Sequence, residues 1–352
     1  MTLAHREYGF AIVGCGAIAP YHARSIASLP NARLRAVVDL EAARAERFAA
    51  ESGATAYTDL DAMLDRPDID VVCVCLPSGL HAEIGSRVAA AGTHVVVEKP
   101  IDVSLEAADR LIGACRREGV KLAVISQYRF LPAFQRVQQA LSAGQFGRPI
   151  LGGAIVPWYR SQAYYDSAGW RATWEQDGGG ALMNQGVHHL DLLRWLLGPV
   201  DSVVGRCATA AHDIAVEDVA LALLTFTSGA LGVVQVSTAI YPGFPERLEI
   251  SGTDGTAIVE ADQITVWQRR AEQGETGPYG KALRAASMES APEPVPPWFA
   301  AHRAQLADLL EAIDTDRDPL VSGEEARATL QLVLAMYESA RGGYPVTLAP
   351  SG

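Results

Sequence analysis

The hydrophobic and polar positions of the chain change their pattern at about residue 126. Before that point, short β-branched runs alternate with stretches rich in Ala, Arg and Glu. The runs lie at 10–14, 34–39, 71–76, 94–99 and 121–126, and the stretches of helical character lie at 19–28, 41–52, 81–91 and 104–118. This alternation predicts a parallel sheet with helices on both faces. The continuously apolar strands fit a sheet that is covered on both sides.

After residue 126 the pattern predicts a different architecture. Helices are expected at 132–143 and 181–197, and a strand near 150–156. Further strands follow in series, joined by short turns that favour an antiparallel sheet, at 203–211, 217–227, 230–240, 246–252, 256–260 and 263–268. Residues 270–297 are a Pro- and Gly-rich connection, and helices at 299–313 and 324–341 close the chain.

The fold class predicted from these patterns is α/β with two domains. Residues 1–126 are predicted to form a doubly wound parallel sheet, and residues 127–352 a second α/β domain with a large, mainly antiparallel sheet. A length of 352 residues suits two domains, and 49% apolar residues permit a large core.

Composition and charge exclude several classes of function. The 29 Lys and Arg residues against 41 Asp and Glu residues leave a net charge of −12, which argues against nucleic-acid binding. No signal peptide or membrane span is recognisable. The five cysteines form no CxxC pair, so a reducing, cytoplasmic location without disulfides is expected, and no metal site is predicted.

Two glycines follow the first apolar run, in AIVGCGAIAPYHARSI (11–26). Gly14 suits a tight turn, and Gly16 lets backbone N–H groups approach a pyrophosphate. Ala19 keeps the next helix close to the strand, and the N-terminus of that helix favours an anion. Such turns are common, but here βαβ units surround the motif. The loop, with Ala17 and Ile18, is therefore predicted to bind a dinucleotide.

An acidic residue closes the second strand. Asp39 lies where a carboxylate accepts hydrogen bonds from ribose hydroxyls and repels a 2′-phosphate, so NAD is favoured over NADP. The same residue can instead cap the helix at 41–52. Both roles are compatible with one side chain.

The run HVVVEKP (94–100) ends an apolar strand with a charged pair. Ligands of open parallel sheets bind at the carboxyl ends of strands, so Lys99 is expected where a nicotinamide and a substrate meet. A solvated lysine at a strand end is the ordinary alternative. Pro100 stops the strand, and the sequence leaves open whether the bond before it is cis.

The segment DGGGALMNQGVHHLDLLRWLLG (177–198) joins a glycine turn to an amphipathic helix. Four residues spaced by 4, 3 and 4 positions share one helical face: Asn184, His188, Asp191 and Trp195. His188 is a candidate acid or base near neutral pH. The alternatives are a structural or surface histidine, or a hydrogen bond between Asn184 and His188.

The preceding segment, WYRSQAYYDSAGWRATW (158–174), is rich in aromatic and basic side chains. The rings of Tyr165 and Trp170 can pack against the C–H surface of a sugar. Arg160 and Arg171 are fork-shaped donors for hydroxyl, carboxylate or phosphate groups. A structural aromatic loop or a subunit contact is the alternative.

Together these motifs resemble those of one family, the Gfo/Idh/MocA sugar and polyol dehydrogenases. The similar motifs are GxGxxA at 14–19, EKP at 98–100, SQYRFLP at 126–132, GGGxLxNxGxHxxD at 178–191 and the closing SGEEARATLQLVLAMYESARGGYPVTL. The resemblance covers essentially the whole chain. It implies an NAD-binding Rossmann domain over residues 1–126. It also implies, over residues 127–352, an α/β domain for substrate binding and oligomerisation, whose large open sheet usually forms a dimer or tetramer interface.

The resemblance also implies roles for single residues. Lys99 matches the active-site lysine, and His188 matches the usual general acid/base. Asn184 departs from the family pattern, because this position is often Asp; an amide cannot take a proton and can only orient a hydroxyl or the imidazole. Contacts to the cofactor are implied for residues outside the glycine loop as well: Pro77, Ser78, His81, Glu98, Lys99 and Gln127.

The expected reaction moves a hydride between NAD and a secondary hydroxyl or ketone of a sugar, inositol or related polyol. Substrate contacts are expected from Lys99, Arg160, Tyr165, Trp170, Arg171, Asn184 and His188. Two other functions stay open. One is a glycoside-cleaving enzyme that oxidises and re-reduces its sugar and accumulates no NADH. The other is a dinucleotide-sensing regulator without catalysis, against which the presence of both Lys99 and His188 argues.

Overall fold

The computed structural model describes residues 6–273 and 299–349, so most of the connection predicted at 270–297 lies outside the described residues. The chain divides into two compact units. The described part of the first unit comprises residues 6–127, 175–178 and 299–330, and that of the second comprises 128–174, 179–273 and 331–349. The first unit therefore includes the 126-residue region predicted as a domain and takes two further segments from later in the chain.

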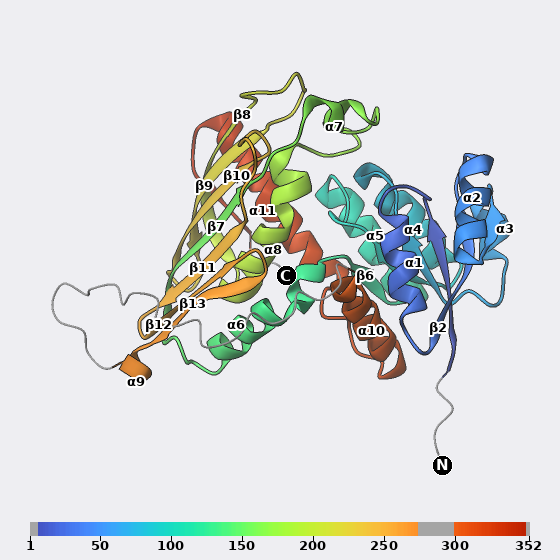
Figure 1. Cartoon of the computed structure of the whole chain (residues 1–352), viewed down its shortest axis with the longest axis horizontal. Coiled ribbons are helices and arrows are strands. Elements are labelled where there is room, and N and C mark those ends of the chain that lie inside the picture. The colour runs from blue at the N-terminus through green and yellow to red at the C-terminus, as the bar shows by residue number, and fades with distance from the viewer. Residues whose placement is uncertain (1–5, 274–298, 350–352) are drawn as a thin grey trace, which may run out of the picture. The chain divides into compact units, whose positions relative to one another are not determined.

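The first unit contains a six-stranded parallel sheet in the order β3-β2-β1-β4-β5-β6 (Figure 1). Its strands are β1 (Tyr8–Val13), β2 (Ala32–Val38), β3 (Thr55–Tyr57), β4 (Val71–Val74), β5 (His94–Val97) and β6 (Leu122–Val124). Its helices are α1 (Ala19–Ala27), α2 (Ala42–Ser52), α3 (Leu60–Leu64), the 3₁₀ turn η1 (Ser78–Leu80), α4 (His81–Ala90), α5 (Leu105–Glu118) and α10 (Ala300–Asp314).

The core of the first unit lies around its central strands. Every residue of β1 and of β4 is buried, as expected for continuously apolar strands. Phe10 and Ile12 pack there with Leu309 of α10, which explains why a helix from the end of the chain belongs to this unit. Strand β3 and helix α3 were not predicted, because three and five residues are too short for a clear period.

The second unit is built on an eight-stranded mixed sheet in the order β13-β12-β11-β7-β10-β9-β8-β14. Within this second sheet, β7 and β10 form the only parallel pair among the described strands, and the other neighbouring strands are antiparallel. The strands are β7 (Pro149–Pro157), β8 (Val200–Ala208), β9 (Val219–Phe226), β10 (Leu231–Ser237), β11 (Arg247–Gly252), β12 (Gly255–Glu260), β13 (Gln263–Arg269) and β14 (Val346–Thr347). The prediction of a large, mainly antiparallel sheet is confirmed.

Helices of the second unit are α6 (Pro132–Ser142), α7 (Gln162–Asp166), the π-helix η3 (Ala181–Gly186), α8 (Val187–Leu197) and α9 (Arg270–Gln273). The 3₁₀ turn η2 (Gln127–Phe130) and helix α11 (Gly323–Gly342) each contribute residues to both units. The predicted helix at 181–197 is therefore a π-helix that continues as an α-helix. In the described part of the chain, no helix is long and apolar enough to cross a membrane.

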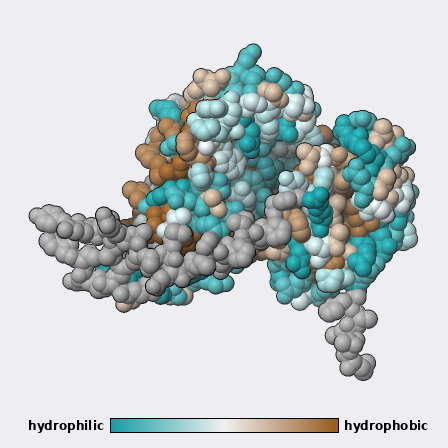
Figure 2. All heavy atoms as spheres, in the orientation of Figure 1, coloured by the Kyte–Doolittle hydropathy of each residue, from teal (hydrophilic) through white to brown (hydrophobic). Residues whose placement is uncertain are grey.

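The two faces of the second sheet differ. Helix α8 packs on the inner face, where a side chain at Gly152 would collide with Leu193 and Leu197. The outer face exposes a row of apolar side chains from β8, β9, β10 and β7: Val204, Leu221, Leu223, Leu231, Val233 and Leu151. Figure 2 shows hydrophobic atoms along the margin of this unit where Figure 1 places β8 and β9.

Candidate active site

The glycine loop between β1 and α1 presents open backbone. Gly14 has a φ of +95°, and a Cβ there would lie 2.5 Å from the carbonyl oxygen of Cys75. Gly16 and Ala17 are exposed, and nothing lies within 4 Å of the place where a side chain of Gly16 would begin. The half-buried Ile18 precedes the first residue of α1. This loop leaves room for an anion at the N-terminus of a nine-residue helix.

Asp39 ties the end of β2 to the glycine loop. Its Oδ2 accepts a hydrogen bond from the Cys15 N–H at 2.9 Å, and its Oδ1 accepts one from the Glu41 N–H at 3.0 Å. The N-cap position of α2 is occupied by Glu41, so Asp39 is not the cap of that helix and this alternative is wrong. Arg44 approaches the same carboxylate at 3.6 Å.

The turns after β4 and β5 are held together by buried polar groups. Ser78 begins η1 beside Pro77 and is buried. The ring of His81 is buried, with Nδ1 2.8 Å from the Pro100 carbonyl oxygen and Nε2 2.9 Å from the Leu76 carbonyl oxygen. Burial lowers the pKa of His81, and the contacts with these two carbonyl oxygens act in the opposite direction. Its side chain therefore supports both loops and does not point outward.

In the Glu98–Lys99–Pro100 turn, the acidic side chain is buried and the neighbouring basic side chain is half-buried. The Lys99–Pro100 bond is cis. Glu98 is buried, and its Oε1 lies 2.7 Å from His22 Nε2. Lys99 is half-buried at the carboxyl end of the sheet. Gln127, also half-buried, has an Oε1 atom without a hydrogen-bond partner among the described residues.

In the second unit, Glu217 anchors the glycine turn. Its carboxylate accepts hydrogen bonds from the N–H groups of Gly180 and Leu182 and from the hydroxyl of Tyr337 at 2.9 Å. A Cβ on Gly180 would lie 1.8 Å from the Glu217 carbonyl oxygen, and one on Gly179 would lie 2.1 Å from the Tyr337 hydroxyl. These close contacts explain why the turn uses glycine.

The helix that follows carries the predicted polar face. Asn184 lies in η3 and His188 lies in the first turn of α8. Both are half-buried, whereas the other residues of 181–193 are buried. The His188 ring stacks on Tyr128, with ring centroids 5.0 Å apart. A π-helix widens the turn that presents Asn184, a local distortion that is frequent at functional sites.

A buried ion pair holds this helix from behind. Arg129 donates two hydrogen bonds to Asp191, from Nε at 2.7 Å and from Nη2 at 2.6 Å. Both side chains are buried, and Trp195 lies 5.5 Å from the guanidinium. Asp191 and Trp195 therefore serve the helix itself, while Asn184 and His188 are the accessible part of the predicted face.

The aromatic segment brings two arginines to one tyrosine. Arg171 Nη1 donates to the Tyr164 hydroxyl at 2.8 Å, and its guanidinium lies over the rings of Tyr164 and Trp170. The Arg160 guanidinium lies 5.2 Å from the same Tyr164 ring. Gln185 Nε2 also donates to the Tyr164 hydroxyl, at 3.2 Å, which connects this cluster to the helix of Asn184.

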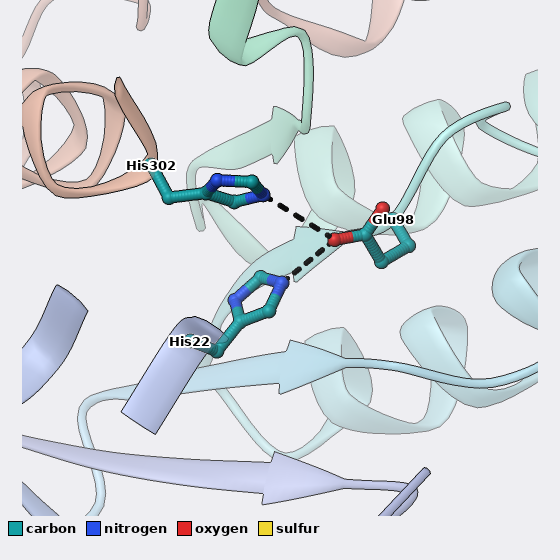
Figure 3. A group of neighbouring side chains, drawn as sticks. All are labelled: His22, Glu98 and His302. Atoms are coloured by element: carbon teal, nitrogen blue, oxygen red, sulfur yellow. Dashed lines mark hydrogen bonds and ion pairs between the residues drawn. The ribbon is translucent and has the colours of Figure 1, made fainter. Parts of the chain in front are cut away.

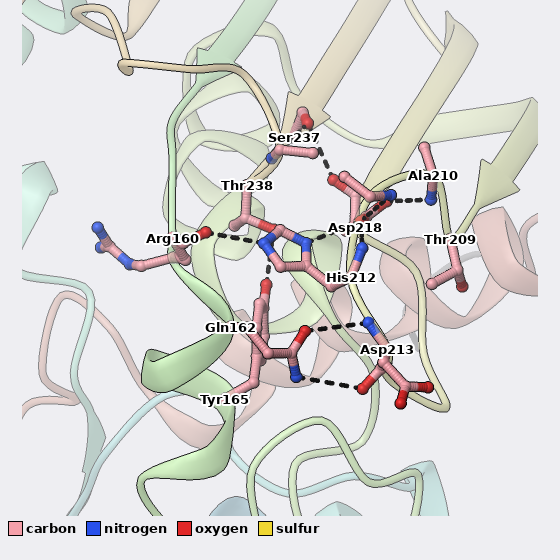
Figure 4. Close-up of polar contacts among 12 residues, drawn as sticks. Arg160, Gln162, Tyr165, Thr209, Ala210, His212, Asp213, Asp218, Ser237 and Thr238 are labelled. Atoms are coloured by element: carbon pink, nitrogen blue, oxygen red, sulfur yellow. Dashed lines mark hydrogen bonds and ion pairs between the residues drawn. The ribbon is translucent and has the colours of Figure 1, made fainter.

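A second network fixes the backbone under Arg160, as Figure 4 shows. The carboxylate of Asp218 accepts hydrogen bonds from His212 Nδ1 and from the N–H groups of residues 210–212. His212 Nε2 lies 2.8 Å from the Arg160 carbonyl oxygen. Tyr165 is buried here, bonds to Thr238 at 2.6 Å and packs on His212. Tyr165 thus supports the segment from within, and Tyr164 takes the outer place.

Sequence reasoning missed several residues of this arrangement. Glu217, His212 and Asp218 sit in an ordinary run between two strands, and nothing in their spacing marks them. His302, to which the sequence analysis assigns no role, is buried beside Glu98. The hydrophobic pattern of α10 could have placed His302 inward, since Leu306 and Leu309 share its helical face.

Comparison with known proteins decides the family. Residues 8–126 match the family model for the oxidoreductase family with an NAD-binding Rossmann fold, and residues 134–258 match the model for the GFO/IDH/MocA C-terminal domain. The WlbA dehydrogenase from Bordetella pertussis, solved with NADH and UDP-GlcNAcA, is 34% identical with a TM-score of 0.86; the match covers 98% of this chain and 99% of that one. The chain belongs to the Gfo/Idh/MocA oxidoreductases.

Curated Gfo/Idh/MocA relatives act on different molecules. The scyllo-inositol 2-dehydrogenase (NAD(+)) of Bacillus subtilis is 27% identical, covering 96% of this chain and 95% of the relative. The D-apiose dehydrogenase of Paraburkholderia graminis is 28% identical, covering 99% and 91%. The chain is thus an oxidoreductase whose first unit is an NAD-binding Rossmann fold, as predicted.

Proposed function

We propose that the protein is an NAD-dependent dehydrogenase that transfers a hydride between a secondary hydroxyl of a sugar or polyol and the nicotinamide. One observation carries this proposal for a chain of this family. Among the ionisable residues of the EKP motif (98–100) and of the glycine turn and helix at 178–191, Lys99 and His188 are half-buried and the others are buried. We assign both side chains to the reacting hydroxyl of the substrate.

The residues supply what this chemistry needs. NAD, when bound, accepts the hydride. His188 takes the hydroxyl proton, and its stacking on Tyr128 holds the imidazole plane. The Lys99 ammonium stabilises the developing alkoxide. Asn184 has no proton to exchange, so it orients the hydroxyl or the imidazole.

The dinucleotide lies on the glycine loop in this proposal, with its pyrophosphate against the open backbone at Gly16. Asp39 accepts hydrogen bonds from the ribose and disfavours NADP. The Asp39→Ala variant also loses the bonds to Cys15 and Glu41, so we expect weaker NAD binding and a smaller preference for NAD. The ratio of the two Kd values measures this, and an unchanged ratio would leave Asp39 a structural role only.

The substrate carries an anionic group. Arg160 and Arg171 flank one tyrosine, and the Nε atoms of both are buried without a hydrogen-bond partner in the described part of the chain. Two guanidiniums that form no ion pair with a carboxylate of the described residues favour a carboxylate or phosphate on the substrate. The complex of the WlbA relative with UDP-GlcNAcA supports the inclusion of nucleotide sugars.

The test is a substrate panel with NAD, read by the absorbance of NADH. Inositols, free aldoses, uronic acids and nucleotide sugars including UDP-GlcNAcA form the panel. We expect net NADH with anionic members, and Arg171→Ala should raise KM for those members while Arg136→Ala, which removes a guanidinium lying over Trp267, should not. Bond cleavage without NADH would indicate the glycoside-cleaving reaction, and binding of NAD without any turnover would indicate a sensor.

The exposed outer face of the second sheet supports a homo-oligomer, a dimer or tetramer. Leu221, Leu223 and Val233 form part of an apolar surface without a cover in the described chain. Leu223→Asp should shift the sedimentation of the protein toward the monomer. Leu40→Asp, which changes a leucine that is 94% exposed in the first unit, is the matched control. A monomeric parent would refute this assignment.

A further inference from the structure

Two histidines from distant parts of the chain point at one oxygen of Glu98. His22 comes from α1 and His302 from α10, and Figure 3 shows both rings directed at the carboxylate. The Nε2 atom of His22 lies 2.7 Å from Oε1, and that of His302 lies 4.0 Å from it. All three side chains are buried. Such a cluster in the first unit needs a balance of charge.

The protonation states provide that balance. Burial raises the pKa of Glu98, but the hydrogen bond from His22 and the nearby positive charges lower it to about 2. Burial lowers the pKa of His22; contacts with Cys75, Cys73 and Glu98 outweigh this and raise it well above its ordinary value. The Cys75 thiol is itself neutral, because burial raises its pKa to about 11, so the effective partner of His22 is Glu98.

The remaining imidazole is uncharged. Burial and the charge on His22 lower the pKa of His302 to about 4. Its Nδ1 atom has no hydrogen-bond partner among the described residues. The directions of these pKa shifts correspond to an imidazolium, a carboxylate and a neutral imidazole near pH 7, with a net charge of zero; the Nδ1 atom of His22, like that of His302, has no hydrogen-bond partner among the described residues.

This neutral cluster adjoins Lys99. The Lys99 N–H donates to Glu98 Oε2 at 3.3 Å, and the Lys99 charge is among the causes that lower the pKa of Glu98. The two charges therefore act on each other. The next residue, Pro100, contacts His81 through its carbonyl oxygen. The charge of Glu98 also acts on His81, where it works to raise the pKa.

We propose that His22 is a positioning residue for Lys99: it pairs with Glu98 and so keeps the carboxylate neutralised and fixed beside the Lys99 backbone. The inference deepens the proposed dehydrogenase function and rests on it, because the role of Lys99 there depends on its charge and placement. His302 completes the cluster as a neutral neighbour.

A metal ion is the competing occupant. The three ligand atoms lie within 4.8 Å of one another, and two histidines with a carboxylate form a donor set typical of zinc. A metal, however, needs the lone pair of His22 Nε2, and a protonated His22 uses this nitrogen to donate to Glu98. The hydrogen-bonded pair accounts for the geometry without an ion, so we favour it.

Removing each partner has a different consequence for Lys99. In His22→Gln the carboxylate loses its counter-charge, which favours the Lys99 ammonium and raises its titration midpoint by about one pH unit or more. In Glu98→Gln the carboxylate disappears and buried His22 becomes neutral, so the net charge near Lys99 stays zero and the midpoint changes little. The double variant His22→Gln/Glu98→Gln is also neutral and should behave like the parent.

The experiment uses the scarcity of lysine. The sequence contains three lysines, Lys99, Lys121 and Lys281, so NMR of the full-length protein labelled at the lysine side chain gives few signals, and Lys99→Arg identifies the one of interest. The control is His94→Gln. His94 is the first residue of β5, the strand that precedes Lys99, and its imidazole accepts a hydrogen bond from the Lys121 N–H. This variant should leave the Lys99 titration unchanged.

The outcomes separate the two proposals. An upward shift in His22→Gln that the double variant abolishes supports the inference, and an unchanged midpoint in His22→Gln, or a clear fall in Glu98→Gln, overturns it. Zinc that binds the parent at one equivalent and is lost in both His22→Gln and His302→Gln also overturns it. Because NMR needs no substrate, a failed substrate panel beside a shifted Lys99 signal would refute only the proposed reaction.

Failure of the variants to fold does not prevent the test. Nitrogen-15 spectra of the histidine-labelled parent then decide, and the His212→Gln variant removes the signal of another imidazole that lies against a carboxylate, that of Asp218. One imidazolium that persists to pH 8 is the expected result. Its absence would contradict a protonated His22.

Discussion

The two sheets of the chain differ in what covers them. Every residue of β1 and β4 in the first sheet is buried. In the second sheet, β9 alternates between buried residues, such as Ala222 and Leu224, and exposed or half-buried ones, such as Leu221 and Leu223. The first sheet can meet a ligand only at its strand ends, whereas the second offers one face to helices and leaves the other open.

This difference determines the surroundings of the residue in each unit that we propose to be catalytic. Lys99 lies in a turn at a strand end and is backed by buried charges, so its surroundings are electrostatic. His188 lies on a helix that packs on the inner sheet face and is backed by an aromatic ring and by the Arg129–Asp191 pair under the helix. We therefore expect the proposed function of Lys99 to respond to changes of nearby charge and that of His188 to respond to changes of packing.

Removal of the lysine should have the largest effect. Lys99→Ala deletes the charge that stabilises the alkoxide, so we expect kcat to fall by about 10³- to 10⁴-fold while NAD still binds. Steady-state kinetics with the accepted substrate and NAD titration measure the two quantities. Lys121→Ala, which removes an ammonium paired with Asp316, is the control and should keep its turnover. Near-parental kcat in Lys99→Ala would refute the assignment.

Replacement of the histidine should come next. His188→Gln keeps a polar side chain of similar length but cannot exchange a proton, and we expect kcat to fall by about 10²- to 10³-fold. Tyr128→Leu should lower kcat less, because it only loosens the imidazole that stacks on it. If Tyr128→Leu were as damaging as His188→Gln, the ring stacking rather than proton transfer would be the main contribution of this helix.

One glycine from each unit, Gly16 and Gly180, extends the comparison of the two units to the free energy of unfolding. Gly180→Ala places a Cβ 1.8 Å from the Glu217 carbonyl oxygen, and we expect a loss of about 3 kcal/mol in the free energy of unfolding. Gly16→Ala meets open space, so it should leave stability nearly unchanged and weaken NAD binding instead. Denaturant unfolding and NAD titration of both variants measure these effects. An equal loss of stability in Gly16→Ala and Gly180→Ala would mean that the glycine loop is packed.

The smallest effect concerns pH. Burial raises the pKa of Glu217 from 4.5 to about 6 in the fold. A carboxyl with a raised pKa stabilises the fold while protonated, fully below about pH 4.5, and this contribution is lost as the pH rises through 6. Relative to Glu217→Gln, the parent should therefore lose about 2 kcal/mol of unfolding free energy between about pH 4 and pH 7.5. A constant difference would show that the hydrogen bonds offset the burial.

The parts that could be predicted from sequence have strong local signals. Strands β1, β4 and β5 are continuously apolar, and the glycine loop follows the first of them, so the Rossmann unit was confirmed. Asn184 and His188 could be paired because helical spacing fixes a shared face. The family resemblance then assigned roles that periodicity alone could not.

The supporting residues could not be predicted, for a physical reason. Glu217 meets Gly180 across 37 positions, and His302 meets Glu98 across more than half of the chain. Such contacts depend on tertiary packing, and no local pattern encodes them. Tyr164 and Tyr165 show the same limit at short range: they are neighbours in the short helix α7, and only the structure tells which one is buried.

The most direct test follows deuterium in a single turnover. A substrate found in the panel, deuterated at the carbon that bears the reactive hydroxyl, is mixed with the NAD-loaded parent and with Lys99→Ala. The account predicts that the deuterium appears on the nicotinamide, rapidly in the parent and far more slowly in the variant. Deuterium that never reaches the nicotinamide, or that reaches it equally fast without Lys99, would contradict it.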